Sequence, residues 1–521
     1  LVLKKISLVG VILYCSSVAN GASILALFSS LSFTDQAVFR GYVGLLASRG
    51  HSVVVMTPYA GHFPPAVKDK VIELDVGQES AALWDEYFAL VTNVDDPYAR
   101  LRDHNDFTVK LAIAQLKSKQ MTALFINPNI KFDLVITEAD VPLLYAVAEK
   151  YKSSHIAITT SSGKIHQYEA QNVPVHPVLY PDVNALSYGN SSSLWQKAVA
   201  LGRHFGTKRE YNGYQHLSEL AAKAIFKFER SLDDIEKDID MLFVANNPAL
   251  IGNRPSGSSV VYTDRLQVQP GYPLPEDLKS ILDSATKGAI YFSLGALQPA
   301  EQLSKELLNT LTESFRHLPY TVLWKIGNTT NINIPKNVVA GDWFPQQEVL
   351  AHPNMKVFIT NGGPRSLEEA VFYGVPIIGL PTIKTRKVFI EQVTKHGAGE
   401  ILNPHYLDKE TLHATISVVA RDVKYKNAVL KLKEAIFDPI ISGPDHAVLW
   451  TEHVLRNGGA KHLKSNTSSF LETYLLDVFS FILLQIAGVI VMIYLAVRHV
   501  IRKIKRRIIE RRGLDGKYKA L

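Results

Sequence analysis

Residues 356–373 read KVFITNGGPRSLEEAVFY: an apolar run, a turn with two glycines, and a segment with helical spacing that opens on a proline. A short apolar run is typical of a strand buried in a parallel sheet, and Pro364 suits the first position of a helix. Glycines let the backbone approach a ligand closely, and the amino end of a helix favours an anion. The stretch predicts a strand at 356–360, a ligand-binding turn at Asn361–Gly363 and a helix at 364–373.

The same alternation continues on both sides of this unit. In the second half of the chain, further strands are expected at 288–295, 321–324 and 376–380, with a helix at 301–315. In the first half, strands are expected at 23–28, 52–56, 132–137 and 155–159, with helices before Gly50 and at 142–150. Strand–helix repetition predicts an α/β protein with parallel, doubly wound sheets. We expect two such halves, with a ligand cleft between them at the carboxyl ends of the strands.

Composition narrows the class of protein. The 521 residues are 47% hydrophobic and 20% charged, which excludes disordered and fibrous chains. The single cysteine, Cys15, excludes a disulfide framework and a multi-cysteine zinc site, and the histidines show no metal-binding spacing. The net charge of +7 comes from the last residues, 498–521, where ten Lys and Arg face two acidic residues. We therefore expect no metal and no nucleic acid as a partner.

The amino end predicts a secretory signal peptide over residues 1–21. Lys4 and Lys5 precede an apolar run at 6–14, and the small residues Ala19 and Gly21 stand at positions −3 and −1 before a cleavage site. The run is too short to span a bilayer. A buried first strand is the alternative, although the run 23–28 fits that role better.

The carboxyl end predicts a transmembrane helix. Residues 478–497 carry no charge, and about 20 residues at about 1.5 Å each match a bilayer core. A buried core helix is the alternative. The basic tail 498–521 predicts a cytosolic end and hence a single-pass type I protein with a luminal body. Sequons at Asn190, Asn328 and Asn466 are compatible with a luminal body, and the ending KYKAL resembles an endoplasmic reticulum retrieval signal.

The predicted organisation thus has five parts. These are the signal peptide at 1–21, an amino-terminal domain at 22–265, a carboxyl-terminal domain at 266–470, the transmembrane helix at 478–497 and the tail at 498–521.

The neighbourhood of the glycine turn resembles a family signature. The run from Trp343-Phe-Pro-Gln346 through Glu369 to Gly374-Val-Pro376 is similar to the signature of the UDP-glycosyltransferase (UDP-glucuronosyltransferase) family, in its membrane-bound animal branch. The likeness extends to Ser32–Arg40, 289–295 and 450–456. The resemblance implies a GT-B fold, in which two Rossmann-like domains face a cleft. It also implies transfer of a hexose or hexuronic acid from a UDP-sugar co-substrate to a small lipophilic acceptor, without another cofactor. A homo- or hetero-oligomer is compatible with it.

Position by position, the resemblance implies a UDP site in the second half. Trp343 would stack on uracil, Gln346 would bond the uridine, and Glu369 would accept from the ribose hydroxyls. The turn residues Asn361, Gly362 and Gly363, with Ser366, would meet the diphosphate. Two alternatives stay open: Trp343 as a core aromatic residue, and Glu369 on a solvated helical face.

The chain departs from the family's pattern where the chemistry is expected. The family's catalytic His corresponds to Asp35, and its helper Asp corresponds to Glu138, with Asp140 close by. Where the family signature has a His that touches phosphate, this chain has Asn361. Where the family has an Asn in the first turn of the helix, this chain has Arg365. Where the family has a serine after the strand at 288–295, this chain has Ala296. The family binds the sugar with an acidic residue followed by Gln, and this chain has Thr385-Arg386 at those positions.

These departures leave the activity open. Asp35 has a structural alternative as the cap of a helix that begins at Gln36. As a base it needs a raised pKa, which Glu138 or Asp140 could provide. Arg365 and Arg386 could replace lost phosphate contacts or lie solvated on the surface. The hypotheses are an active UDP-glycosyltransferase, a catalytically silent relative that binds nucleotide or lipophile or regulates active partners, and a membrane interaction module.

Overall fold

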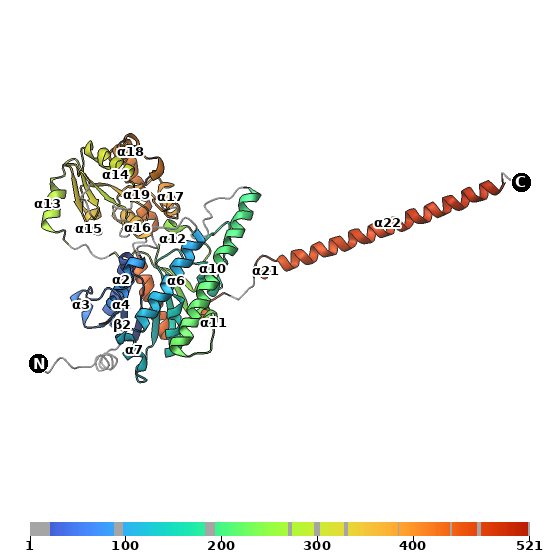
Figure 1. The fold of residues 1–521 in the computed structure, drawn as a ribbon, viewed down its shortest axis with the longest axis horizontal. Coiled ribbons are helices and arrows are strands. Elements are labelled where there is room, and N and C mark those ends of the chain that lie inside the picture. Colours follow the sequence, from blue (N-terminus) through green and yellow to red (C-terminus); the bar gives the residue numbers. More distant parts are fainter. Residues whose placement is uncertain are drawn as a thin grey trace. The chain divides into compact units, whose positions relative to one another are not determined.

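The computed structural model divides the chain into two units, Leu1–Ser465 and Asn466–Leu521 (Figure 1). The structure describes residues 21–87, 97–182, 193–268, 273–295, 303–327, 332–383, 385–437, 440–465 and 470–518. The predicted signal peptide, apart from Gly21, lies outside these ranges, as do Asn190, Asn328, Asn466 and Ala296.

The first half of the larger unit is built on a seven-stranded parallel sheet of order β3-β2-β1-β4-β5-β6-β7. Its strands are β1 (Ser23–Leu27), β2 (Ser52–Thr57), β3 (Val71–Asp75), β4 (Leu134–Glu138), β5 (Ser154–Thr159), β6 (Met241–Val244) and β7 (Val260–Tyr262). β2 shows why such runs form central strands, since all six of its residues are buried. The strand order reverses between β1 and β4, so the loops after these strands leave at a topological switch point.

The second half carries a six-stranded parallel sheet of order β10-β9-β8-β11-β12-β13. Its strands are β8 (Ala289–Ser293), β9 (Thr321–Lys325), β10 (Val338–Gly341), β11 (Met355–Thr360), β12 (Ile377–Gly379) and β13 (Gly399–Ile401). Here the order reverses between β8 and β11. The turn Asn361–Gly363 therefore leaves the sheet at its switch point, where ligands of such sheets bind.

Helices cover both faces of each sheet, which confirms the doubly wound α/β prediction. The first half contains α2 (Phe33–Ser48), α3 (Pro65–Lys68), α4 (Gly77–Ala81), α6 (Pro97–Leu116), α7 (Lys119–Ile126), α8 (Tyr145–Tyr151), α9 (Ile165–Ala170), α10 (Leu194–Phe226), α11 (Leu232–Lys237) and α12 (Pro248–Ile251). The second half contains α13 (Glu276–Ser284), α14 (Lys305–Arg316), α15 (Gln346–Ala351), α16 (Pro364–Phe372), α17 (Arg386–Thr394), α18 (Lys409–Arg421), α19 (Val423–Ile436) and α20 (Gly443–Asn457).

One helix begins later than the sequence suggested. The expected helix at 301–315 begins at Lys305, because the Ser304 side chain caps it by accepting a hydrogen bond from the backbone N–H of Leu307. Residues 301–302 lie outside the described ranges.

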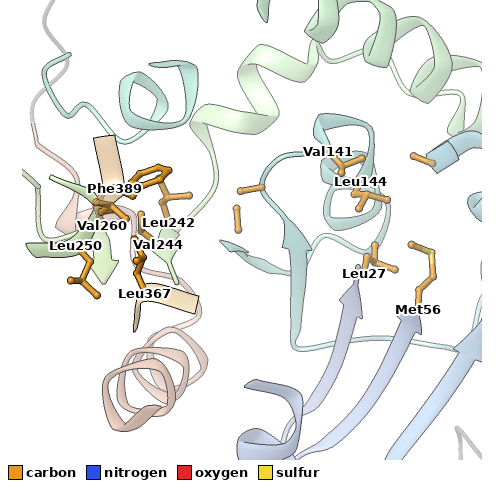
Figure 2. Packing of buried hydrophobic residues seen from close by; sticks show 14 of the residues in the cluster. Leu27, Met56, Val141, Leu144, Leu242, Val244, Leu250, Val260, Leu367 and Phe389 are labelled. Atoms are coloured by element: carbon orange, nitrogen blue, oxygen red, sulfur yellow. The ribbon is translucent and has the colours of Figure 1, made fainter. Parts of the chain in front are cut away.

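One large apolar cluster of described residues contains side chains from both halves. In the first half, Leu27 and Met56 at the ends of β1 and β2 belong to it, together with Leu144 (Figure 2). The same cluster contains Leu367 of α16 and Phe389 of α17, and α12 of the first half packs against both of these helices. The helix that follows the glycine turn is therefore packed against the opposite half by buried apolar side chains.

The chain also returns to its first half near the end of the larger unit. α20 packs against α2, and the Tyr42 hydroxyl lies 2.5 Å from the Thr451 hydroxyl in a fully buried contact. Ala447 and Val454 of α20 belong to the core on that face of the first sheet. The predicted domain boundaries at 265 and 470 remain predictions.

The smaller unit contains α21 (Phe470–Thr473) and α22 (Leu476–Tyr518). Residues 476–509 of α22 are long and apolar enough to cross a membrane, and none of its apolar window is buried. The predicted segment 478–497 lies within this stretch. The alternative of a helix buried in a protein core is not supported, because the apolar side chains of this stretch are exposed.

Replacing Tyr42 by Phe tests the packing of α20. We expect Y42F to lower the free energy of unfolding by about 1 kcal/mol, because Thr451 loses a buried hydrogen-bond partner. Urea unfolding of the full chain in detergent measures the change. Y406F is the matched control, since Tyr406 is 85% exposed and its loss should change nothing. Equal effects of the two substitutions would contradict the role given to this contact.

Candidate active site

Glu138 holds the loop that follows β1. It is the last residue of β4, the neighbour of β1 at the switch point, and it is buried. Its Oε2 accepts hydrogen bonds from the backbone N–H groups of Ser29, at 2.8 Å, and Ser30, at 2.9 Å. Burial, and then the charge of Asp140, raise the pKa of Glu138 to about 8, although the two N–H groups act against this. Glu138 therefore positions the loop that leads into α2.

Asp35 lies in the first turn of α2 but does not cap it. Ser32 is the capping residue, since its Oγ accepts from the backbone N–H of Asp35 at 3.3 Å, so the capping alternative for Asp35 is wrong. The Ser30 hydroxyl donates to Oδ2 of Asp35, also at 3.3 Å. Burial raises the pKa of Asp35, and the charge of Asp140 adds a smaller effect in the same direction. The raised pKa that a carboxylate base requires thus comes mainly from burial.

Asp140 lies close by but is already paired. Its Oδ1 is 3.2 Å from the Lys164 ammonium, and its Oδ2 accepts a hydrogen bond from Thr159 at 2.6 Å. Burial raises the pKa of Asp140, but Lys164 and the hydrogen bonds outweigh it, and the pKa lies below its ordinary value. Asp140 is therefore suited to remain an ion rather than to take up a proton.

In the second half, three of the predicted UDP-binding residues contact one another. The Gln346 amide donates to Glu369 Oε2 at 2.7 Å and lies 3.3 Å from the Ser366 hydroxyl. Gln347, which the sequence did not single out, donates to the other oxygen of Glu369 at 3.3 Å. Glu369 is only 6% exposed, so the solvated-face alternative is wrong. Burial raises the pKa of Glu369 to about 7.

Trp343 lies on the surface where the halves meet. Its side chain is 54% exposed, which contradicts the core-aromatic alternative. Phe33, the first residue of α2, meets it edge-on at 5.0 Å between ring centroids. The Lys325 ammonium lies 4.6 Å from the centre of the Trp343 ring. An exposed indole of this kind offers a ring for stacking, next to the helix that carries Asp35.

The turn after β11 has the conformation that its glycines suggested. Gly362 has a φ of +85°, and Gly363 precedes the first turn of α16. Asn361 is buried, its amide donates to the Leu294 carbonyl, and its side-chain oxygen accepts from Arg386. Thr385 directly precedes α17 and makes no side-chain capping bond.

Arg365 does not lie free at this turn. Its guanidinium donates to the Thr160 carbonyl of the first half at 2.9 Å and forms a buried ion pair with Glu368, at 3.4 Å. The sequence hypothesis that Arg365 replaces a phosphate contact therefore gains no support. Its partner Thr160 follows β5 and gave no signal in the sequence, because the contact joins distant segments.

Among the described residues, no group of three or more His, Cys, Asp and Glu side chains is arranged to hold a metal ion.

Comparison with known proteins places this arrangement in a family. The sequence pattern of the "UDP-glucoronosyl and UDP-glucosyl transferase" family matches residues 26–511. The chain belongs to this UDP-glycosyltransferase family. It is 31% identical to an ecdysteroid UDP-glucosyltransferase of Spodoptera littoralis nuclear polyhedrosis virus over 86% of this chain and 90% of that protein. It is 26% identical to UDP-glucuronosyltransferase 3A1 of Mus musculus over 89% of this chain and 90% of that protein.

Solved structures agree on the fold. The glycotransferase of kitacinnamycin matches 84% of this UDP-glycosyltransferase with a TM-score of 0.55, over 99% of its own chain, at 17% identity. The spinosyn forosaminyltransferase SpnP matches 84% of the chain with a TM-score of 0.56, over 99% of its own chain, at 15% identity. Together with the two parallel sheets, these matches confirm the predicted GT-B fold.

The pH dependence of stability tests the burial of Glu138. Its pKa is 4.5 ordinarily and about 8 here, so between these values the folded chain holds a proton that the unfolded chain releases. We therefore expect stability to fall as pH rises from 5 to 8, by up to about 1.4 kcal/mol per pH unit from this group. E138Q removes this part of the fall.

Urea unfolding of the full chain in detergent at pH 5, 6.5 and 8 measures the effect. E410Q is the matched control, because the Glu410 side chain is 72% exposed. Parallel pH profiles for wild type and E138Q would show that Glu138 has no raised pKa.

Proposed function

We propose that this family member transfers a hexose or hexuronic acid from a UDP-sugar to a small lipophilic acceptor. The observation that carries the proposal is the hydrogen bond between half-buried Gln346 and buried Glu369, next to Ser366 and the glycine turn. A carboxylate so held offers an acceptor for ribose hydroxyls, and the amino end of α16 favours a diphosphate. We assign uracil stacking to Trp343, uridine contacts to Gln346 and Glu369, and diphosphate contacts to the backbone of the turn Asn361, Gly362 and Gly363 and to Ser366.

Asp35 is the proposed base. The acceptor oxygen attacks the anomeric carbon of the sugar, the bond from that carbon to the diphosphate oxygen breaks with its electron pair going to UDP, and the acceptor proton passes to Asp35. A carboxyl group with a raised pKa is a stronger base than an ordinary Asp. Glu138 positions the loop of Asp35 through Ser29 and Ser30. Asp140 contributes a fixed negative charge.

The side chains beside Asp35 support a lipophilic acceptor. Leu31, Tyr87, Phe107 and Leu111 form an apolar cluster in the first half. Tyr87 meets Trp84 edge-on at 5.9 Å between ring centroids. Burial raises the pKa of the Tyr87 hydroxyl, and the charge of Asp35 raises it further, so the cluster lies within electrostatic reach of the proposed base.

Substitution of Asp35 tests the proposal. We expect the full chain to transfer sugar in a panel of UDP-sugars and lipophilic alcohols or phenols, and D35N to lower kcat by at least about 100-fold, the usual contribution of a general base. UDP affinity, measured by calorimetry, should stay within about twofold, because Asp35 accepts a proton and holds no nucleotide.

D69N is the matched control, since Asp69 is an exposed carboxylate of the same half. UDP binding without transfer of any sugar by the wild type would favour the catalytically silent relative. Absence of UDP binding would overturn the proposal.

We also propose a place and orientation for the chain: the endoplasmic reticulum membrane, crossed once by α22, with the body in the lumen. The basic residues that follow the apolar stretch support a cytosolic tail. The homo- or hetero-oligomer considered above stays an expectation.

Protease protection tests this orientation. In sealed microsomes, we expect added protease to remove an epitope tag at the carboxyl end while the larger unit stays intact, because only the tail faces the cytosol. Detergent should then expose the larger unit, which serves as the control. Protection of the tag in sealed microsomes would reverse the proposed topology.

A further inference from the structure

The guanidinium of Arg386 lies at the glycine turn. Arg386 is the first residue of α17, and one of its terminal nitrogens lies 3.6 Å from the point where a Cβ on Gly363 would stand. The same nitrogen lies 3.6 Å from the corresponding point on Gly295, just after β8. The guanidinium therefore lies between the two chain segments that leave the switch point of the second sheet.

Within the described part of the chain, this cation has no acidic partner at contact distance. Among the ion pairs that the described residues form within 4.0 Å, none includes Arg386. Burial lowers the pKa of Arg386, while Tyr87 and Asp35 act in the opposite direction through space. A partly desolvated guanidinium without a carboxylate is stabilised by an anionic ligand.

Asn361 fixes the direction of this guanidinium. Its amide nitrogen donates to the Leu294 carbonyl, which leaves its side-chain oxygen to accept from Arg386. The reverse orientation of the amide would set its NH₂ group against the guanidinium, donor against donor. Because Asn361 is only 2% exposed, water does not substitute for these partners.

The backbone of Arg386 is held as closely as its side chain. A Cβ on Gly362 would lie 2.4 Å from Ile390 of α17 and 3.2 Å from the Arg386 carbonyl oxygen. Only glycine at this position allows α17 to pack so near the turn. The amino ends of α16 and α17 are thus fixed together.

We propose that Arg386 supplies the positive charge that holds the donor's diphosphate, with Asn361 as its positioning residue. This inference rests on the proposed function, and of the roles that the sequence left open for Arg386 it selects the phosphate contact over the sugar contact. When the bond between sugar and diphosphate breaks, UDP gains the electron pair and one negative charge. A guanidinium fixed at that point stabilises the charge. Two departures from the family pattern, at 361 and 386, then form one functional unit.

Binding of UDP and of uridine to the full chain in detergent separates the diphosphate from the nucleoside. We expect R386Q to weaken UDP binding at least about 10-fold, as for loss of a charge-assisted contact, and to leave uridine binding within about twofold. R386K, which keeps the charge, should retain a larger part of the UDP affinity. K387Q is the matched control, because Lys387 is the next residue of α17 and pairs with Glu391 in solvent.

The positioning role of Asn361 is tested in a double-mutant cycle. We expect N361A to weaken UDP binding in the wild type and to have no further effect in R386Q, since the cation it orients is then absent. Unchanged UDP binding by R386Q, or equal weakening of UDP and uridine, overturns this inference alone. The inference is also overturned if R386Q binds UDP normally and loses only the preference between UDP-glucuronic acid and UDP-glucose. That result would place Arg386 on the sugar. Failure of the wild type to bind UDP overturns the proposed function as well.

Discussion

The relation between the two halves depends on one buried carboxylate, Glu368 of α16. Its Oε2 accepts from the backbone N–H of Arg265 at 3.2 Å and from the Gln267 amide at 2.8 Å, and it pairs with Arg365 at 3.4 Å. Arg365 in turn donates to the Thr160 carbonyl. A buried ion pair adds little net stability, but losing one partner costs about 3–5 kcal/mol. The network therefore fixes position: it ties the connection between the halves, the end of β5 and the amino end of α16 to one point.

With α16 fixed, the departures from the family pattern contact one another in two places: Glu138 with the loop of Asp35, and Asn361 with Arg386. Glu138 is one methylene longer than the Asp that the resemblance led us to expect there. One of its two carboxylate oxygens accepts from two successive backbone N–H groups in the loop that leads to Asp35. Asn361 is neutral, and the cation that it orients comes from Arg386. The substitutions at these positions are therefore better understood as a rearranged set of contacts than as independent losses.

The sequence predicted the parts of the structure that local pattern determines. Central strands such as β1, β2, β4 and β11 are mainly apolar runs. The two glycines before Pro364 likewise predict the turn that the structure has. The short strands β7, β12 and β13, with three residues each, carry little pattern; only β12, beside the glycine unit, was expected, and β3 mixes two acidic residues into its run. The pairings that shape the site, such as Asp140 with Lys164 and Arg365 with Thr160, join segments far apart in the chain. Periodicity and spacing hold no information about such contacts.

Electrostatics connects the two proposed roles of the site. The positive charge of Arg365 lowers the pKa of Asp35, and Asp35 and Arg386 are likewise within electrostatic reach of each other. A diphosphate bound at Arg386 brings negative charge to the same region and cancels part of the field that the Arg386 guanidinium exerts on Asp35. The carboxylate of Asp35 then loses part of the stabilisation of its ionised form, and its pKa rises further. A donor bound at the turn of α16 would therefore strengthen the base on α2, so that proton acceptance is favoured once the leaving group is in place.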